Sequence, residues 1–297
     1  MNALTSSPDG LALSARNGQR GRMPASPPAP PAIGLIGLGL MGAAFSERLL
    51  AAGTAARLTE NTDEVFACHD RIVLSFPDHH IVAAVLGTAP LRAGQIVIDM
   101  TTGAPEAAEA TAAALAQRGV AYLDATVSGN SDQTRSGEAV YFVGGERTAF
   151  LRCADVFTAL GGTVQYAGES GSGARMKLIT NLVMGLNRVA LAEGLAFARA
   201  LGVEPEAALA ALRTSQAWSR IMDTKGEKMI SGDFTPQARL SQHLKDVRLM
   251  LAAAAARGLA LPLSEAHRAV LEAAEALGLG GLDNTAIVRT YQPRDGE

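Results

Sequence analysis

One short segment near the start of the chain constrains its fold more than any other. Residues 32–36 (AIGLI) form an apolar run that predicts a buried strand, and Gly37-Leu38-Gly39-Leu40-Met41-Gly42 follows directly. Residues 43–52 then predict a helix that ends at Gly53. In a G-x-G-x-x-G motif between a strand and a helix, the glycines allow a tight turn, a close approach of the backbone to a pyrophosphate and close helix packing. The segment therefore predicts a dinucleotide-binding fold of the Rossmann type, with these six residues at the cofactor.

Apolar runs alternate with helical stretches through the rest of the first half. A helix is expected over 105–117, with Pro105 in its first turn, and further strands are expected at 71–76, 95–99, 119–123, 140–143 and 163–166. Such alternation is typical of a mostly parallel, doubly wound sheet, in which ligands bind at the carboxyl ends of the strands. We therefore expect the chemistry to lie in the segments after Gly37, Phe76, Asp99 and Asp124.

The strand pattern stops at about Gly173. Residues 174–201 predict one long helix, and shorter helices are expected over 204–215, 217–230, 238–257, 262–277 and 283–291. The sequence of 297 residues thus divides into three parts. These are a Pro-, Ser- and Gly-rich tail at 1–31 that is expected to be disordered, a Rossmann-like domain at 32–170 and an all-α domain at 171–297.

Composition argues against several classes of function. A net charge of −3 and an aromatic content of 4% do not suit a nucleic-acid binder, which needs a basic surface and stacking side chains. No apolar run reaches the roughly 18 residues of a membrane span. Cys68 and Cys153 are too few for a disulfide framework, and neither they nor His79-His80 have the spacing of a metal site. We expect a cytoplasmic protein without a metal, nucleic-acid or membrane partner.

Five motifs follow one another along the chain: GLIGLGLMG at 34–42, DMTTGAP at 99–105, DATVSG at 124–129, GSGARMKLITN at 171–181 and HLKDVRLML at 243–251. This series resembles the β-hydroxyacid dehydrogenases, which include 3-hydroxyisobutyrate dehydrogenase and tartronate semialdehyde reductase, over about residues 33–291. The resemblance implies an NAD- or NADP-dependent oxidoreductase that transfers a hydride between the nicotinamide and a small β-hydroxy acid or semialdehyde.

The resemblance assigns the catalytic roles to Lys177 and Asn181. Their i, i+4 spacing places both on one face of a helix. In the family the lysine is the general acid/base: it takes up the hydroxyl proton during oxidation, if its pKa falls toward neutral pH, and returns it during reduction. Burial and nearby cations such as Arg175 or Lys245 would lower that pKa, and Asn181 would orient the substrate hydroxyl or Lys177. A solvated lysine on a helix surface is the alternative.

The resemblance places the substrate carboxylate at Ser128, Gly129 and Asn130. In the family a D-A-P-V-S-G-G segment holds the carboxylate with hydroxyl and backbone N–H donors; here Thr126 replaces the proline and Asn130 replaces the last glycine. Asparagine tolerates a positive φ better than most residues, so we expect the turn to be retained with a narrower or more polar pocket. An ordinary Ser-Gly-Asn turn is the alternative.

Two further residues are assigned to the cofactor by resemblance. Thr102 corresponds to the threonine of a D-M-S-T motif near the nicotinamide, although a threonine here can equally cap the helix that begins near Pro105. Lys245 corresponds to the lysine of a Lys-Asp pair that closes over the cofactor from the helical domain. The alternative is that Lys245 and Asp246 are plain surface charges.

The first domain is abridged between its first helix and the next clear strand. Residues 54–71 are about two dozen fewer than a complete mononucleotide-binding half requires. In one placement, residues 55–60 form the second strand and Glu60 binds the ribose hydroxyls; in the other, that strand is lost and 61–65 only begin a later helix. No arginine follows an asparagine to read a 2′-phosphate, although Arg57 can substitute for it, so the sequence slightly favours NAD over NADP.

The long helix at 174–201, with the apolar helices around it, predicts a homodimer formed through the helical domain. The leading interpretation is an oxidoreductase for a small carboxylic acid substrate, and two other functions stay open. Imine reductases share the architecture but generally lack a lysine at the position of Lys177. A degenerate, non-catalytic relative with weak cofactor binding is consistent with the abridged segment.

Overall fold

The computed structural model describes residues 33–54, 56–58 and 62–291. The tail expected at 1–31 and the ribose-binding Glu60 lie outside the described residues. The first half of the described chain consists of β1 (Ile33–Ile36), α1 (Leu40–Ala51), β2 (Ala56–Leu58), α2 (Thr62–Cys68), β3 (Arg71–Leu74), α3 (His79–Thr88), β4 (Ile96–Asp99), α4 (Pro105–Ala116), β5 (Ala121–Ser128), α5 (Ser131–Ser136), β6 (Val140–Gly145), α6 (Arg147–Arg152), α7 (Ala154–Leu160) and β7 (Thr163–Gly168). The second half consists of α8 (Ser172–Ala200), α9 (Pro205–Thr214), α10 (Arg220–Ser231), α11 (Leu240–Ala255), α12 (Pro262–Ala276) and the 3-10 helix η1 (Asn284–Tyr291).

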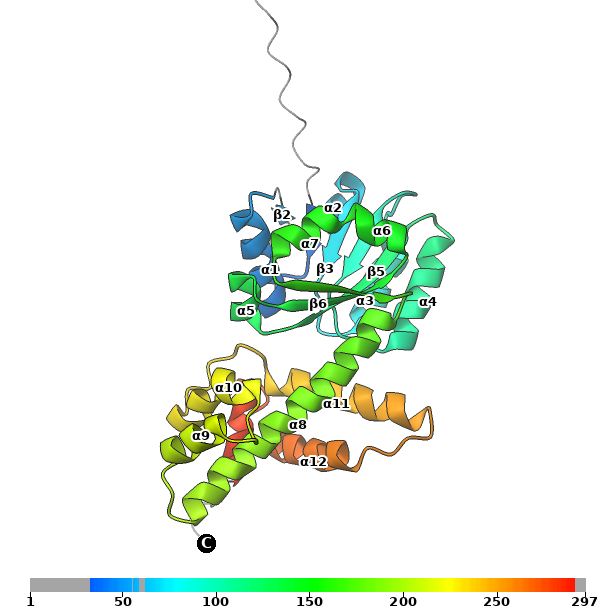
Figure 1. Ribbon diagram of the computed structural model, residues 1–297. Helices are drawn as coiled ribbons and strands as arrows, with labels where there is room; N and C mark the ends of the chain where they lie inside the picture. Colours follow the sequence, from blue (N-terminus) through cyan, green and yellow to red (C-terminus); the bar gives the residue numbers. More distant parts are fainter. Residues whose placement is uncertain (1–32, 55, 59–61, 292–297) are drawn as a thin grey trace, which may run out of the picture. The chain divides into compact units, whose positions relative to one another are not determined.

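The strands of the described residues form one seven-stranded sheet in the order β2-β1-β3-β4-β5-β6-β7 (Figure 1). All neighbouring strands are parallel except β5 and β6, which pair antiparallel. Parallel neighbours need a crossover connection, and helices supply it here. The Rossmann-like fold with a helical second half, predicted from the sequence, is confirmed.

The abridged segment between α1 and β3 keeps one strand and one short helix. β2 pairs with β1, and α2 leads directly into β3 on the other side of β1. The structure therefore confirms one part of each expected placement. The second strand of the first placement exists, and the helix of the second placement begins at Thr62. A full dinucleotide-binding sheet has a further parallel strand outside β2. Among the described residues β2 is the edge strand, so the outer strand is the element that the shortened segment lacks there.

Several elements differ from the sequence expectations. β5 continues to Ser128 instead of ending at Leu123, because its pairing with β6 extends over the whole DATVS segment. α1 begins at Leu40, inside the glycine motif. The helices α3, α5, α6 and α7 were not predicted, since segments of 6 to 10 residues show too little of the helical period. The last predicted helix is a 3-10 helix.

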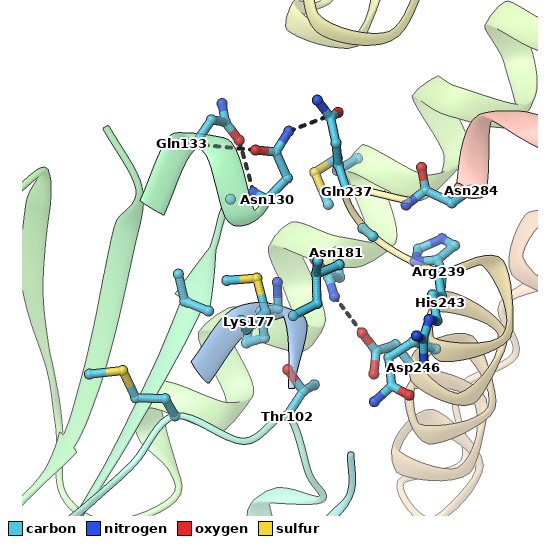
Figure 2. A pocket seen from close by; sticks show the side chains of 18 of the residues that line it. Thr102, Asn130, Gln133, Lys177, Asn181, Gln237, Arg239, His243, Asp246 and Asn284 are labelled. Atoms are coloured by element: carbon cyan, nitrogen blue, oxygen red, sulfur yellow. Dashed lines mark hydrogen bonds between the residues drawn. The ribbon is translucent and has the colours of Figure 1, made fainter. Parts of the chain in front are cut away.

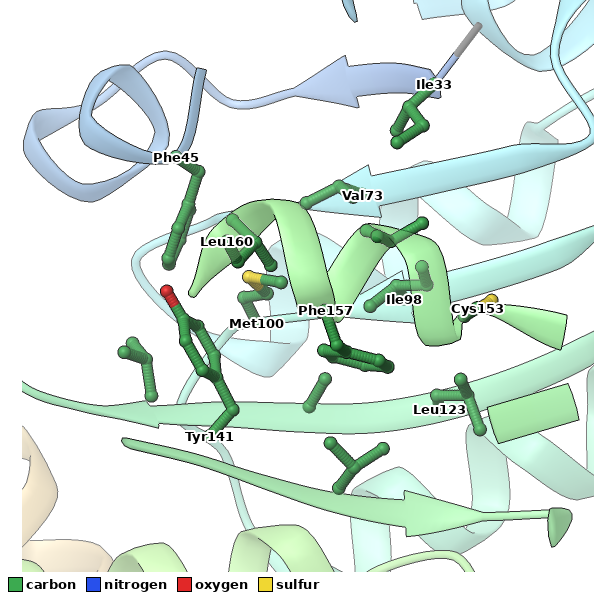
Figure 3. Close-up of a cluster of buried hydrophobic side chains, with 14 of the residues drawn as sticks. Ile33, Phe45, Val73, Ile98, Met100, Leu123, Tyr141, Cys153, Phe157 and Leu160 are labelled. Carbon is green, nitrogen blue, oxygen red and sulfur yellow. The ribbon is translucent and has the colours of Figure 1, made fainter. Parts of the chain in front are cut away.

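Helices cover both faces of the sheet, and each face has its own core. On one face α1, α6 and α7 bury side chains such as Phe45 and Phe157 against Ile98 and its neighbours (Figure 3). On the other face α2, α3 and α4 bury side chains such as Phe66 and Leu86. Each fully buried side chain of this size contributes about 1.5–3 kcal/mol. Because the central strands are buried on both faces, they are continuous apolar runs in the sequence.

The start of α8 is anchored to the sheet by Asp124. The carboxylate of Asp124 in β5 accepts hydrogen bonds from the backbone N–H groups of Gly171 and Ala174, each at 2.9 Å, and so caps the helix. A Cβ at Gly173 would lie 2.2 Å from the carbonyl oxygen of Asp124, so this close approach requires glycine. The Thr126 hydroxyl adds a hydrogen bond to the Gly173 carbonyl at 2.8 Å. These contacts fix the direction in which the next turns of α8 project their side chains.

From this anchor α8 runs out from the sheet into the helical half, where it contacts α9, α10, α11, α12 and η1 (Figure 1). Leu195, Leu244 and Leu271 belong to the shared core of these helices. Gly185 lets the helices pack closely, since a Cβ there would lie 2.6 Å from His243 Nε2. Of the helices in the described part of the chain, none is long and apolar enough to cross a bilayer.

Candidate active site

A cavity of about 300 Å³ lies between the sheet and the helical half. Its sheet side is formed by the segments that follow β1, β3 and β4, including Gly39, Ser75 and Thr102. Its helical side is formed by α8, α10, α11 and the loop before α11 (Figure 2). The cavity is thus at the carboxyl ends of parallel strands, where the sequence predicted that the chemistry lies.

The three glycines of the glycine motif meet different surroundings at the start of α1. Gly37 has a φ of 93°, and a Cβ there would lie 2.2 Å from the Ser75 carbonyl oxygen. A Cβ at Gly42 would lie 1.8 Å from the Gly37 carbonyl oxygen. Gly39, at the N-cap of α1, has open space around its Cβ position with no atom within 4 Å. Two glycines therefore serve the fold, while the third leaves room over a helix N-terminus for the pyrophosphate of a dinucleotide.

Replacing Gly39 with alanine is expected to weaken the binding of reduced nicotinamide cofactor about tenfold or more without lowering the unfolding temperature. The φ of −67° suits alanine, so the fold is not strained, but the added methyl occupies the space meant for phosphate. Forcing a methyl into a close contact costs about 1–3 kcal/mol. Fluorescence titration measures the affinity. Gly87→Ala in α3, where a Cβ also meets no atom within 4 Å, is the control, and an unchanged affinity of Gly39→Ala contradicts the assignment.

The Lys177 side chain is 6% exposed and lines the cavity from an early turn of α8. No hydrogen bond or ion pair joins its Nζ to another described residue. Burial is the main cause that lowers the pKa of Lys177 to about 8; Arg188 and Lys245 lower it further, whereas Asp246 raises it. Of the two cations expected to act on this pKa, Lys245 does so, while Arg175 pairs with a glutamate of α4 instead.

Asn181 lies one turn after Lys177, and α11 fixes its side chain. Its Nδ2 donates a hydrogen bond to Asp246 Oδ2 at 2.9 Å (Figure 2). Its Oδ1 is buried and has no hydrogen-bond partner among the described residues. The other carboxylate oxygen of Asp246 lies 3.2 Å from Lys245 Nζ. Because Asp246 holds the N–H side of the amide, the acceptor side of Asn181 is left for another donor.

Lys245 reaches from α11 to the sheet half. Its Nζ donates hydrogen bonds to the carbonyl oxygens of Pro77 at 3.0 Å and Thr102 at 2.8 Å. These carbonyls belong to the segments after β3 and β4, so Lys245 joins the two walls of the site. Thr102 itself lines the cavity, and α4 begins at a different N-cap, Ala104, without a side-chain cap. The contacts of Thr102 and Lys245 with a cofactor stay predictions.

The three residues expected at the substrate carboxylate lie where β5 meets α5. Gly129 and Asn130 line the cavity, whereas Ser128, the last residue of β5, does not belong to its lining. Asn130 has a φ of −97°, so the positive φ considered from the sequence is not adopted. Instead, Asn130 Oδ1 accepts from the Gln133 N–H at 2.9 Å and its own N–H donates to Gln133 Oε1 at 3.0 Å, which caps α5 (Figure 2). Its Nδ2 points to Gln237 Oε1 at 3.4 Å.

Sequence reasoning missed several residues of the helical wall. Arg188, Lys225, Gln237, Arg239 and His243 all line the cavity. Arg188 was detectable, because it lies eleven residues after Lys177, on the same face of the predicted long helix. The others come from separate elements whose meeting depends on the tertiary fold.

The described residues contain no arrangement of three or more His, Cys, Asp or Glu side chains that could hold a metal ion. Cys68 and Cys153 are both free thiols. The functional groups that line the cavity include the Lys177 amine, the Asn181 amide and the Arg188 guanidinium.

Comparisons with known proteins agree with this architecture. Residues 171–291 match the family model for the NAD-binding of NADP-dependent 3-hydroxyisobutyrate dehydrogenase, and residues 51–168 match that for the NAD binding domain of 6-phosphogluconate dehydrogenase. The chain is 30% identical to 2-(hydroxymethyl)glutarate dehydrogenase of Eubacterium barkeri over 247 residues, which cover 81% of this chain and 82% of that protein. It is 30% identical to 2-hydroxy-3-oxopropionate reductase of Escherichia coli over 277 residues, which cover 86% and 95%.

Two further matches bear on fold and function. The crystal structure of 3-hydroxyisobutyrate dehydrogenase from Salmonella typhimurium has a TM-score of 0.80 at 24% identity, covering 87% of this chain and 99% of that one. Mouse cytokine-like nuclear factor N-PAC is 31% identical over 271 residues and 86% of this chain, but this chain spans only 50% of that protein. The relatives and family models confirm the resemblance seen in the motifs. The chain belongs to the 3-hydroxyisobutyrate dehydrogenase family of NAD(P)-binding oxidoreductases.

Proposed function

We propose that this protein interconverts a small β-hydroxy acid and the corresponding semialdehyde, with NAD or NADP as cofactor and Lys177 as general acid/base. The observation that carries the proposal is a buried lysine without a protein partner among the described residues, in a cavity that also reaches the glycine motif. The cofactor, when bound, supplies the site that accepts or donates the hydride. The residues of the protein then have two tasks, which are to hold the substrate and to transfer one proton.

Lys177 is suited to move that proton in either direction. When the alcohol is oxidised, its hydroxyl loses a proton, which neutral Nζ accepts; when the semialdehyde is reduced, the ammonium form returns it to the carbonyl oxygen. A general acid/base works best with a pKa near the working pH. A pKa of about 8 leaves both forms of Lys177 available in mildly alkaline solution.

Asn181 and Asp246 act as positioning residues in this proposal. Asp246 accepts a hydrogen bond from Asn181 Nδ2, and this fixes the orientation of the amide. Its Oδ1 is therefore left to accept a hydrogen bond from another group. A substrate hydroxyl or the Lys177 ammonium is such a donor. Asn181 then holds the hydroxyl next to Nζ in the orientation that proton transfer requires.

The other end of the substrate is assigned to the loop between β5 and α5. Gly129 and Asn130 lie on the cavity wall, and Asn130 Nδ2 supplies a donor for a carboxylate. Two curated relatives carry names that denote acids with a hydroxyl group close to the carboxylate, 2-(hydroxymethyl)glutarate and 2-hydroxy-3-oxopropionate. This agreement supports a hydroxy acid as the substrate class.

The proposal is tested by following cofactor oxidation and reduction with a panel of 3-hydroxy acids, their semialdehydes and cyclic imines. Turnover of the hydroxy acids or semialdehydes supports it. Turnover of imines alone would favour an imine reductase, and lack of cofactor binding at millimolar concentration would favour a non-catalytic relative. Each outcome therefore selects one of the three functions that the sequence leaves open.

We also propose that two copies of the chain associate through α8. Ile179, Val183 and Phe197 are 58%, 54% and 64% exposed, and they follow one stripe of this helix. Exposed apolar stripes of this kind mark interaction surfaces. Light scattering is expected to give twice the mass of one chain, and Phe197→Glu is expected to give a folded monomer. Leu151→Glu in α6, which also places a charge at an exposed apolar residue, is the control; a monomeric wild type contradicts the proposal.

A further inference from the structure

Arg188 is a buried cation on the wall of the cavity with no described partner. It is 2% exposed, and both its Nε and its Nη1 are buried without a hydrogen-bond acceptor among the described residues. It lies seven residues after Asn181 on the same helix, which is about 10 Å along the axis at 1.5 Å per residue. A buried guanidinium without acceptors is costly, so such a group in a cavity indicates a missing anionic partner.

The carboxylate that most directly opposes Arg188 is already engaged. Asp283 raises the pKa of Arg188, but burial outweighs it, and the pKa of Arg188 falls to about 10. Asp283 accepts hydrogen bonds from Lys225 Nζ at 3.1 and 3.2 Å, from the backbone N–H groups of Gln237 and Ala238, and from Thr285. Lys225 is thereby neutralised, whereas Arg188 is not.

The charges of the cavity lining as a whole also favour an anion. Among its lining residues the cations are Lys177, Arg188, Lys225 and Arg239, and the only carboxylate of that set is Asp246. Asp246 is taken up by Asn181 and Lys245. Burial lowers the pKa of His243 well below its usual value, and Arg188 lowers it further. His243 is therefore uncharged and does not change the net charge of the cavity lining. Of the two cations by which α8 lines the cavity, Lys177 and Arg188, Arg188 lies farther along the helix.

We propose that Arg188 binds a second carboxylate of the substrate, which is therefore a dicarboxylic hydroxy acid. This inference rests on the proposed function: the hydroxyl is at Lys177 and Asn181, the first carboxylate is at Gly129 and Asn130, and the second lies farther along α8. A guanidinium forms strong, charge-assisted hydrogen bonds with a carboxylate, and Nε and Nη1 of Arg188 have donors that no described residue uses.

The test compares 2-(hydroxymethyl)succinate, with two carboxylates, and 3-hydroxyisobutyrate, with one, in the wild type and in Arg188→Met. The wild type is expected to favour the dicarboxylate. In Arg188→Met, kcat/KM for the dicarboxylate is expected to fall about tenfold to hundredfold, mostly through KM, since hydrogen bonds to charged groups are worth that much. The value for 3-hydroxyisobutyrate is expected to stay nearly unchanged. Arg199→Met, at an exposed arginine of α8, is the control.

A binding measurement separates failure of this inference from failure of the proposed function. Glutarate, which has two carboxylates and no hydroxyl, is expected to raise the unfolding temperature of the wild type but not of Arg188→Met. Arg188→Met alone should fold at least as well as the wild type, because it removes a buried charge that lacks a partner. Equal responses of both proteins to glutarate, or a response to inorganic phosphate but not to glutarate, would overturn the inference even if hydroxy acids are turned over.

Discussion

Replacing Lys177 with alanine is expected to lower kcat by about 10²–10⁴-fold, the usual contribution of a positioned general acid/base. The substrate hydroxyl then loses its nearest proton acceptor, because Asn181 offers only an amide and Asp246 is held by Asn181 and Lys245. Cofactor affinity should change little, since the glycine motif is on another wall of the cavity. Single-turnover kinetics with the wild type and the variant at saturating cofactor measures this loss.

Two controls make the result specific to the amine. Lys228→Ala removes a lysine of α10 that pairs with Asp233 and is not part of the cavity lining, so its kcat should stay at the wild-type value. Thermal unfolding of Lys177→Ala should show no loss of stability, because a buried cation without a partner has been removed. A Lys177→Ala protein with wild-type kcat would refute the proposed mechanism.

The pH dependence should be the second large effect, with opposite signs in the two directions. Oxidation needs neutral Lys177, so its rate should rise with pH and level off above a pKa of about 8. Below that value the neutral fraction falls tenfold per pH unit, which makes the rate at pH 6 about a hundredfold lower than the plateau. Reduction needs the ammonium form, so its rate should fall as the pH rises through the same value.

Asp246→Asn gives this prediction its own control. The Asp246 carboxylate raises the pKa of Lys177, so removing its charge should move the inflection of the oxidation profile to lower pH. The substituted amide is close in size to the carboxylate, so the packing at this position is retained. An inflection that stays where it is in the wild type would show that Lys177 does not set the profile.

The parts of the fold that could be predicted are those that depend on the pattern of neighbouring residues in the sequence. The strand at residues 33–36, the glycine turn and α1 are contiguous, and the apolar runs of β3 and β4 are buried on both faces. The long helix α8 was recognisable from a stretch over 174–201 without an internal proline, and it extends over Ser172–Ala200. In these segments the periodicity of neighbouring residues decides the structure, so the sequence contains the necessary signal.

Other features depend on contacts between distant residues and carry no local signal. β2 has only three residues and exists because it pairs with β1. The extension of β5 to Ser128 follows from β6, which comes later in the chain. Asn130 was expected to keep the turn by adopting a positive φ, but its φ is −97° and it caps α5 together with Gln133.

The candidate site shows the same division. Lys177 and Asn181 were proposed from one family motif, and the structure places both on the cavity side of α8. Their surroundings come from elsewhere: Asp246 is 65 residues after Asn181, and Lys245 reaches back 143 residues to Thr102. The role proposed for Arg188 depends on Asp283 being already engaged, which no pattern in the sequence indicates.

The central claim is that the abridged first domain still holds a nicotinamide cofactor in front of Lys177. Fluorescence titration of the purified chain with NADH and with NADPH tests it most directly, because it does not require the substrate to be known. We predict saturable binding of at least one of the two cofactors, weakened by Gly39→Ala and retained in Lys177→Ala. Absence of saturable binding of both cofactors up to millimolar concentration would contradict the claim.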